Sequence, residues 1–308
     1  MTRPQTVRHE SDPEIGRVLR VSGGKYHVEI PSGVLEASLR GRVKQKDDRI
    51  VSVGDLVELG RVEDAVRIER IVDRTSALTR HGVAKRREQV IVANVDQVVV
   101  TVAAAAPEPD LLMVDRLLAL AELSAIHGLV VVNKIELAGT TDVPSDMAPY
   151  VDAGYDVMRT SAKTRHGLEE LAERLRDRIS VFTGQSGVGK SSLLNALMPG
   201  LDLRVGEVGQ RKGRGRHTTV AAALYPYPGG GYVADTPGLQ YLSLWEVDPA
   251  SLDTGFVEFS EFAETCRFGD CRHRREPSCG VRDAVERDDV SERRYASYLG
   301  LLEEAEGK

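Results

Sequence analysis

The 308-residue sequence contains no hydrophobic run of the ~18–20 residues that a membrane-spanning helix needs. Residues 1–16 also lack the apolar segment of a signal peptide. We therefore expect a cytoplasmic protein without a membrane partner. Internal repeats and low-complexity linkers are absent too, and the length suits two or three domains with ample core.

Cysteine is scarce, and its placement is informative. Only three cysteines occur, and they form a cluster between residues 266 and 279. An odd, clustered set in a cytosolic chain argues against a disulfide framework and favours metal binding. Together with His273 they form a Cys₃His set, a common structural zinc site with no open position for catalysis: Cys266, Cys271, His273 and Cys279. We expect one Zn²⁺ per chain, and the alternative is a group of buried thiols without metal.

A general excess of positive charge is absent as well. The formal net charge is −6, which argues against a surface that coats nucleic acid over its whole extent. Basic residues instead gather in four short segments, at 40–49, 80–87, 211–217 and 272–275. Such local patches bind phosphate backbones even on an acidic chain. The alternative for each patch is a solvated loop.

Two kinds of hydrophobic pattern divide the chain. Residues 15–73 contain about five short alternating strands, with a hairpin signal at Gly23-Gly24. This favours a small OB-type β-barrel, a fold that often binds oligonucleotides, over an SH3-like barrel. From about residue 90, buried strands alternate with helices, which predicts an α/β domain with a mainly parallel sheet; its first strand is expected across residues 89–104.

The C-terminal part follows a third pattern. Beyond Pro249 the sequence is acidic and aromatic before the cysteine cluster, and residues 290–308 have the spacing of an amphipathic helix. We predict three domains: the barrel over residues 1–76, the α/β domain over 77–245, and a zinc-binding helical domain over 246–308.

One phosphate-binding loop lies between a predicted strand and a predicted helix. Residues 184–191, GQSGVGKS, fit the pattern G-x-x-x-x-G-K-[ST] at every fixed position. Glycines let backbone N–H groups turn toward phosphates, Lys190 is expected to reach the β- and γ-phosphates, and Ser191 to bind Mg²⁺. The expected contact set is Gly184, Gln185, Ser186, Gly187, Val188, Gly189, Lys190, Ser191 and Ser192.

Two further pieces complete a phosphate and magnesium site. Asp235-Thr-Pro-Gly238 ends the next apolar strand, where the carboxylate is expected to hold Mg²⁺ and the Gly238 N–H to face the γ-phosphate. Between the two motifs, either Thr218 or Thr219 is expected to complete the magnesium shell in the triphosphate state. The alternative for the threonines is a plain turn before a strand.

Two motifs upstream of the phosphate loop predict guanine recognition. They are Asn133-Lys134-Ile135-Glu136 and Ser161-Ala162-Lys163, each after a predicted strand. The Asn is expected to contact the carbonyl and N7 edge of the base, the Lys stem to cover its ring, and the Glu to accept from N1–H and the amino group. The Ala162 N–H is expected to support the base carbonyl. A carboxylate in that place repels adenine, so the pair predicts GTP and GDP as ligands.

The order of the motifs is unusual, because the base-reading loops precede the phosphate loops. A GTPase normally has the reverse order, and a circular permutation explains the change because neighbouring termini can be joined. A barrel, then NKIE, SAK, GQSGVGKSS, HTT and DTPG, then a Cys/His cluster, resembles the bacterial small-ribosomal-subunit-dependent GTPase family. The resemblance implies GTP hydrolysis coupled to late maturation of the small subunit, contact with its rRNA, and a monomer.

Two positions bear on how far this resemblance extends. Glu136 stands where the family has Asp, which moves the carboxylate outward without changing its hydrogen-bonding logic. Leu239 occupies the place where many GTPases have a water-orienting Gln, and the resemblance suggests His217 as the substitute. The alternatives for the whole chain are a GTP-gated RNA-binding scaffold with little stimulated hydrolysis and, less well supported, a phosphate-loop kinase or ATPase.

Overall fold

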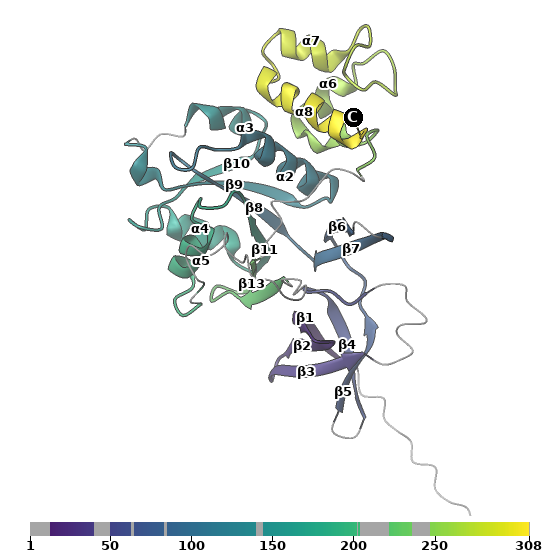
Figure 1. Cartoon of the computed structure of the whole chain (residues 1–308), viewed down its shortest axis with the longest axis vertical. Coiled ribbons are helices and arrows are strands. Elements are labelled where there is room, and N and C mark those ends of the chain that lie inside the picture. Colours follow the sequence, from purple (N-terminus) through teal and green to yellow (C-terminus); the bar gives the residue numbers. More distant parts are fainter. Residues whose placement is uncertain are drawn as a thin grey trace, which may run out of the picture.

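The computed structural model shows three regions arranged along the long axis of the molecule (Figure 1). A β-barrel lies at one end, an α/β domain in the middle, and a helical region with the C-terminus at the other end. The structure describes residues 13–39, 50–62, 65–82, 85–139, 144–201, 203, 222–235 and 247–307. Among the helices in these ranges, none is both long and apolar enough to cross a membrane.

The N-terminal strands close into a five-stranded barrel. The strand order is β1-β2-β3-β5-β4 with β4 returning to β1, and the β3–β5 pair is parallel. This closure confirms the OB-type barrel. Alternating residues such as Val18, Val28, Val57 and Ile68 point inward and are almost completely buried. The strands are β1 (Glu14–Ser22), β2 (Lys25–Ile30), β3 (Gly33–Leu39), β4 (Leu56–Val62) and β5 (Ala65–Ile71).

The central domain contains the predicted, mainly parallel sheet. Five strands run parallel in the order β10-β9-β8-β11-β13, and β12 pairs antiparallel with β13 at the end of this row. Apolar, β-branched sequences make these strands suitable for burial on both faces; all residues of β8 are buried. The strands are β8 (Gln97–Ala103), β9 (His127–Asn133), β10 (Asp156–Arg159), β11 (Arg178–Thr183), β12 (Ala223–Pro226) and β13 (Gly231–Asp235).

The single strand predicted over residues 89–104 is wrong. The structure divides this segment into β7 (Lys85–Ala93), which forms a hairpin with β6 (Ala77–Gly82), and β8. Asn94 separates them with a φ of 55°, and its side-chain amide donates to the Gly54 carbonyl of the barrel. This left-handed residue ends the first strand without the Gly or Pro that sequence patterns use as a break.

Helices cover both faces of the sheet (Figure 1). The helices α2 (Leu111–Leu123) and α3 (Ala148–Asp152) lie on one face, and α4 (Leu168–Leu175) and α5 (Lys190–Leu197) lie on the other. Two short 3-10 turns, η1 (Ile135–Leu137) and η2 (Ser145–Met147), follow β9. The barrel joins the first face, because Leu19 and Val53 belong to the same core cluster as Val98 and Leu118.

The C-terminal region is helical, and its last helix confirms the predicted amphipathic segment. Tyr298, Leu301 and Leu302 of that helix are fully buried, and the region's core also includes Ala119 of α2. The elements are η4 (Leu252–Gly255), η5 (Val257–Phe259), α6 (Ser260–Ala263), α7 (Gly280–Glu286) and α8 (Glu292–Ala305). The domain boundary predicted at 76/77 falls between β5 and β6, and the one at 245/246 lies outside the described residues; both stay predictions.

Candidate nucleotide site and metal centre

The phosphate loop connects β11 to α5 at the carboxyl end of the parallel strands. Its three glycines have positive φ angles between 84° and 132°, a backbone conformation that turns successive N–H groups to one side. The Lys190 ammonium folds back over this loop and donates to the carbonyls of Gly184 and Gln185 at 2.7 and 2.9 Å. Ser191 and Ser192 occupy the first turn of α5. This is the strand–loop–helix arrangement that the motif predicts.

The base-reading loop contacts the phosphate loop directly. The Asn133 side-chain amide donates to the Val188 carbonyl at 2.8 Å, and Lys134 Nζ donates to the carbonyls of Gly187 and Ala106 at 2.6 and 2.7 Å. Position 189 favours glycine, because its φ is 96° and a Cβ there would lie 2.4 Å from Asn133 Nδ2. The two motifs are therefore one assembly, although the chain order separates them.

The Ser161-Ala162-Lys163 loop lies on the other side of Asn133. The Ala162 N–H donates to Asn133 Oδ1 at 3.4 Å, and the Thr160 hydroxyl donates to the same oxygen at 3.3 Å. Ser161 is fully buried and accepts a hydrogen bond from the Thr164 N–H. Thr160 was not among the predicted residues. Its position directly before the S-A-K motif is the only sequence signal for it.

The carboxylate of Glu136 is suited to a ligand with hydrogen-bond donors. Glu136 lies in the η1 turn after Asn133 and Lys134, and its Oε2 atom is buried without a hydrogen-bond partner. A buried, unpaired carboxylate oxygen is costly, and donors such as the N1–H and amino group of guanine would satisfy it. Ile135 is buried and holds the turn against the sheet, and Lys163 is exposed.

The predicted magnesium and catalytic residues are placed only in part. Asp235 is the last residue of β13, and its register partner on the parallel strand β11 is Phe182, just before the phosphate loop. The backbone of Asp235 therefore lies beside the end of β11, where the phosphate loop starts, and its magnesium role stays a prediction. His217, Thr218, Thr219 and Gly238 lie outside the described residues.

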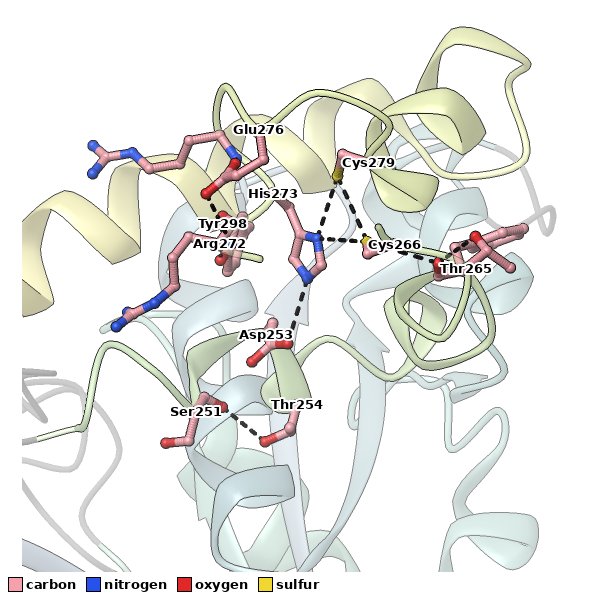
Figure 2. A network of polar contacts seen from close by, with 12 residues as sticks. Ser251, Asp253, Thr254, Thr265, Cys266, Arg272, His273, Glu276, Cys279 and Tyr298 are labelled. Carbon is pink, nitrogen blue, oxygen red and sulfur yellow. Dashed lines mark hydrogen bonds and ion pairs between the residues drawn. The ribbon is translucent and has the colours of Figure 1, made fainter. Parts of the chain in front are cut away.

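The predicted zinc ligands lie close together, and Figure 2 shows three of them, Cys266, His273 and Cys279, facing one another. The ligand atoms of Cys266, Cys271, His273 and Cys279 all lie within 4.8 Å of one another. His273 Nδ1 is 3.6 Å from Cys266 Sγ and 3.4 Å from Cys279 Sγ, and the two sulfurs are 3.9 Å apart. Tetrahedral Zn²⁺, with bonds of ~2.3 Å to sulfur and ~2.0 Å to nitrogen, requires roughly 3.5 Å and roughly 3.8 Å for these separations. The four residues therefore fit a zinc ion.

Two acidic residues hold the frame of the metal cluster. Asp253 contacts the second ring nitrogen of His273, Nε2, at 3.4 Å, which directs Nδ1 toward the thiols (Figure 2). Glu276 accepts backbone hydrogen bonds from Arg272, Arg274 and Arg275. Burial raises the pKa of Glu276, but the backbone donors outweigh it and lower that pKa to about 2, so the carboxylate stays ionised. Sequence analysis missed Asp253, which precedes the Cys266–Cys279 segment and is not part of its ligand pattern.

Without a cation, hydrogen bonds from backbone N–H groups outweigh burial at Cys266 and lower its pKa, whereas burial raises the pKa of the Cys271 thiol to about 12 and also raises that of Cys279. Zn²⁺ stabilises thiolates and reverses this tendency. The loop needs glycine at position 280, because a Cβ there would lie 1.9 Å from the Thr265 hydroxyl. Tyr295 and Tyr298 of α8 donate to the carbonyls of His273 and Arg272, which joins the cluster to the last helix.

Comparison with known proteins identifies the family. A family model described as RsgA GTPase matches residues 71–245, more than half of the chain. The chain belongs to the RsgA GTPase family. It is 43% identical over 300 residues to the small ribosomal subunit biogenesis GTPase RsgA of Gemmatimonas aurantiaca, covering 95% of this chain and 98% of that protein. The corresponding RsgA of Caldanaerobacter subterraneus is 39% identical over 294 residues, covering 95% and 96%.

Two solved structures agree with this RsgA assignment. YjeQ from Thermotoga maritima has a TM-score of 0.78 and 35% identity, covering 96% of this chain and 99% of that chain. YloQ, described as a circularly permuted GTPase, has a TM-score of 0.75 and 29% identity, with 97% coverage of both chains. The predicted fold class is thereby confirmed: a permuted GTPase domain between an OB-type barrel and a C-terminal Cys₃His region. The GTPase class of the enzyme is confirmed with it.

Proposed function

We propose that this RsgA-family GTPase binds the small ribosomal subunit and acts in its late maturation, associating with rRNA in the GTP state and leaving after hydrolysis. The observation that carries the proposal is the hydrogen bond between the Asn133 side chain and the phosphate loop, which joins the predicted base-reading and phosphate motifs on a chain that also has a barrel and a Cys₃His cluster. The relatives named above are themselves small ribosomal subunit biogenesis GTPases.

Within this proposal each motif has its own role toward the nucleotide. Asn133, Lys134, Glu136 and Ala162 read guanine, while Lys190 and the glycine-loop N–H groups hold the phosphates. Ser191, Asp235 and one of the two threonines, Thr218 or Thr219, hold Mg²⁺. When bound, that ion neutralises charge on the β- and γ-phosphate oxygens. By their sequence motifs, the Gly238 N–H would face the γ-phosphate and His217 would orient the attacking water.

The other two domains provide the ribosome contacts. The barrel has the architecture that often binds oligonucleotides, and Arg272, Arg274 and Arg275 lie in the loop of the metal cluster. A Zn²⁺ ion held by Cys266, Cys271, His273 and Cys279 would fix that loop and would take no part in hydrolysis, because four protein ligands leave no open position. The protein acts as a monomer in the cytoplasm.

Co-sedimentation tests the partner. The protein is mixed with small, large and whole ribosomal particles in the presence of GDP or a non-hydrolysable GTP analogue. We expect binding to the small subunit that the analogue strengthens, and turnover that the small subunit stimulates. Equal binding to all particles contradicts the partner, and GTP-dependent binding without stimulated turnover favours the scaffold alternative.

His217→Ala tests the catalytic role separately. Loss of a water-orienting group is expected to lower small-subunit-stimulated turnover by about 10²-fold or more while GDP affinity stays unchanged. Stimulated turnover equal to that of the wild type excludes the role.

A further inference from the structure

The strands β12 and β13 connect the GTPase sheet to the barrel, and β13 ends at a predicted magnesium ligand. The strand β12 begins at Ala223, just after Thr218 and Thr219, and β13 ends at Asp235. These two strands pair with each other antiparallel. On its other edge β12 pairs with β1 of the barrel, where Arg20 is opposite Ala223. Thus one small sheet segment connects the barrel to Asp235, one of the predicted magnesium ligands.

A polar contact strengthens this connection at Tyr232 of β13. The Tyr232 hydroxyl donates to Glu29 Oε2 on β2 at 2.5 Å, and the Arg17 guanidinium of β1 lies over the Tyr232 ring, 5.2 Å from its centre. Arg17 and Glu29 are direct register partners in the barrel. Tyr232 of the GTPase sheet therefore contacts two opposite charges of the barrel, Glu29 through its hydroxyl group and Arg17 through its ring.

The surroundings of Tyr232 make the contact well defined. Its ring is half-buried and packs on the core cluster that includes Leu19 of the barrel and Leu224 of β12. Burial raises the pKa of Tyr232, and the neighbouring Glu29 carboxylate raises it further, so the phenol remains a hydrogen-bond donor at neutral pH. A charge-assisted hydrogen bond in a partly dry site is stronger and more directional than one in water.

We propose that Tyr232 is a positioning residue that couples the barrel to GTP hydrolysis. RNA bound to the barrel shifts β1 and β2, Tyr232 transmits the shift to β13, and the end of this strand sets the position of Asp235. Coupling between two sites is reciprocal, so the nucleotide state changes the RNA affinity of the barrel by the same factor. This inference rests on the function proposed above.

The test compares full-length variants of matched tyrosines. Tyr232→Phe removes only the hydroxyl group. The control is Tyr225→Phe on β12, because Tyr225 is also half-buried but packs on the opposite face of the sheet, away from the barrel. Glu29→Gln removes the charge at the other end of the contact. Each protein is assayed for GDP affinity, turnover alone, turnover with small subunits, and small-subunit affinity with GDP and with the GTP analogue.

We expect Tyr232→Phe to leave GDP affinity and unstimulated turnover within about twofold of the wild type, and to lower the stimulation by about fivefold or more, the lower range of allosteric coupling. The difference in small-subunit affinity between the two nucleotide states should shrink by the same factor. Glu29→Gln should lower the stimulation by a similar factor. The double variant should lose no more stimulation than either single variant, because both substitutions remove the same hydrogen bond.

The outcomes separate this inference from the proposed function. Full stimulation in Tyr232→Phe, with a responsive wild type, overturns the coupling role alone. An equal loss of unstimulated turnover and GDP affinity in that variant also overturns it, because this shows general structural support. A wild type that small subunits neither bind nor stimulate removes the proposed function and this inference together.

Discussion

Arg294 Nη1 and Asp115 Oδ1 lie 2.8 Å apart, although 179 residues separate them in the sequence. Arg294 is only 1% exposed and Asp115 is completely buried. The same guanidinium also binds both carboxylate oxygens of Glu258 at 2.6 and 2.7 Å. Burial lowers the pKa of Arg294, but the Glu258 and Asp115 carboxylates outweigh it and raise that pKa, so the cation is fixed. The C-terminal region is thus held to α2, the helix between β8 and β9.

Arg294→Met tests this link. The change leaves Glu258 without its cation and Asp115 with Arg293 alone, and breaking a buried ion pair by removing one partner costs about 3–5 kcal/mol. We expect the free energy of unfolding in urea to fall by that amount. The control is Arg287→Met, whose exposed pair with Asp289 should contribute less than about 1 kcal/mol. Similar losses for the two variants contradict the buried link.

Glu136 is expected to carry the selectivity for guanine. Glu136→Gln preserves the size of the side chain but places an amide donor where the buried oxygen now lies, opposite the donors of the base. A hydrogen bond to a charged group contributes about 1.5–3 kcal/mol, so GDP affinity should fall by about 10–100-fold. Inosine diphosphate, which lacks the amino group, should be discriminated less by this variant than by the wild type. Calorimetric titration of both nucleotides measures this.

Two further variants complete that experiment. Glu170→Gln changes an exposed acid of α4 and should leave GDP affinity unchanged. Glu136→Asp should keep or tighten GDP binding, because it restores the shorter family side chain. A marked loss in Glu136→Asp shows instead that the surrounding loop is shaped for the longer carboxylate.

Removal of the metal is expected to affect one end of the molecule. The purified protein should contain one zinc per chain, measured by elemental analysis, and Cys279→Ser should lose it. Chelation should increase hydrogen exchange across residues 247–307, while GDP affinity changes by less than about twofold. Ser278→Ala, next to a ligand but exposed, should retain the metal. Loss of GDP binding together with zinc contradicts two separate sites.

Much of the nucleotide site was predictable because its motifs have short, fixed spacing. A glycine loop between strand and helix defines its own backbone path, and the ends of parallel strands meet at one edge of a sheet. Asn133, Ala162 and Val188 therefore come together where the sequence places them. The Cys₃His cluster was predictable for the same reason, since its ligands lie within one short segment.

Long-range contacts were not predictable, because their partners are far apart in the sequence. Residues 89–104 form one apolar, β-branched run, and the break at Asn94 depends on its bond to Gly54 in the barrel. The pattern over residues 290–308 predicted an amphipathic helix but not the burial of Arg294, since an arginine on such a helix normally lies in solvent. The sequence likewise gives no sign of the contact between Tyr232 and Glu29, because the two residues lie 203 positions apart.

The strand order also determines when neighbouring strands can pair during synthesis of the chain. The strand β11 lies between β8 and β13, yet it follows β8 in the chain by the length of α2, β9, α3, β10 and α4. Ribosomes add about 5–20 residues per second, so the edge of β8 that pairs with β11 stays unpaired for several seconds until β11 has been synthesised. Asn133 also lacks its hydrogen-bond partner during this time, since Val188 is synthesised after β11. A nascent chain therefore exposes an unpaired apolar strand and cannot capture nucleotide until the phosphate loop has left the ribosome.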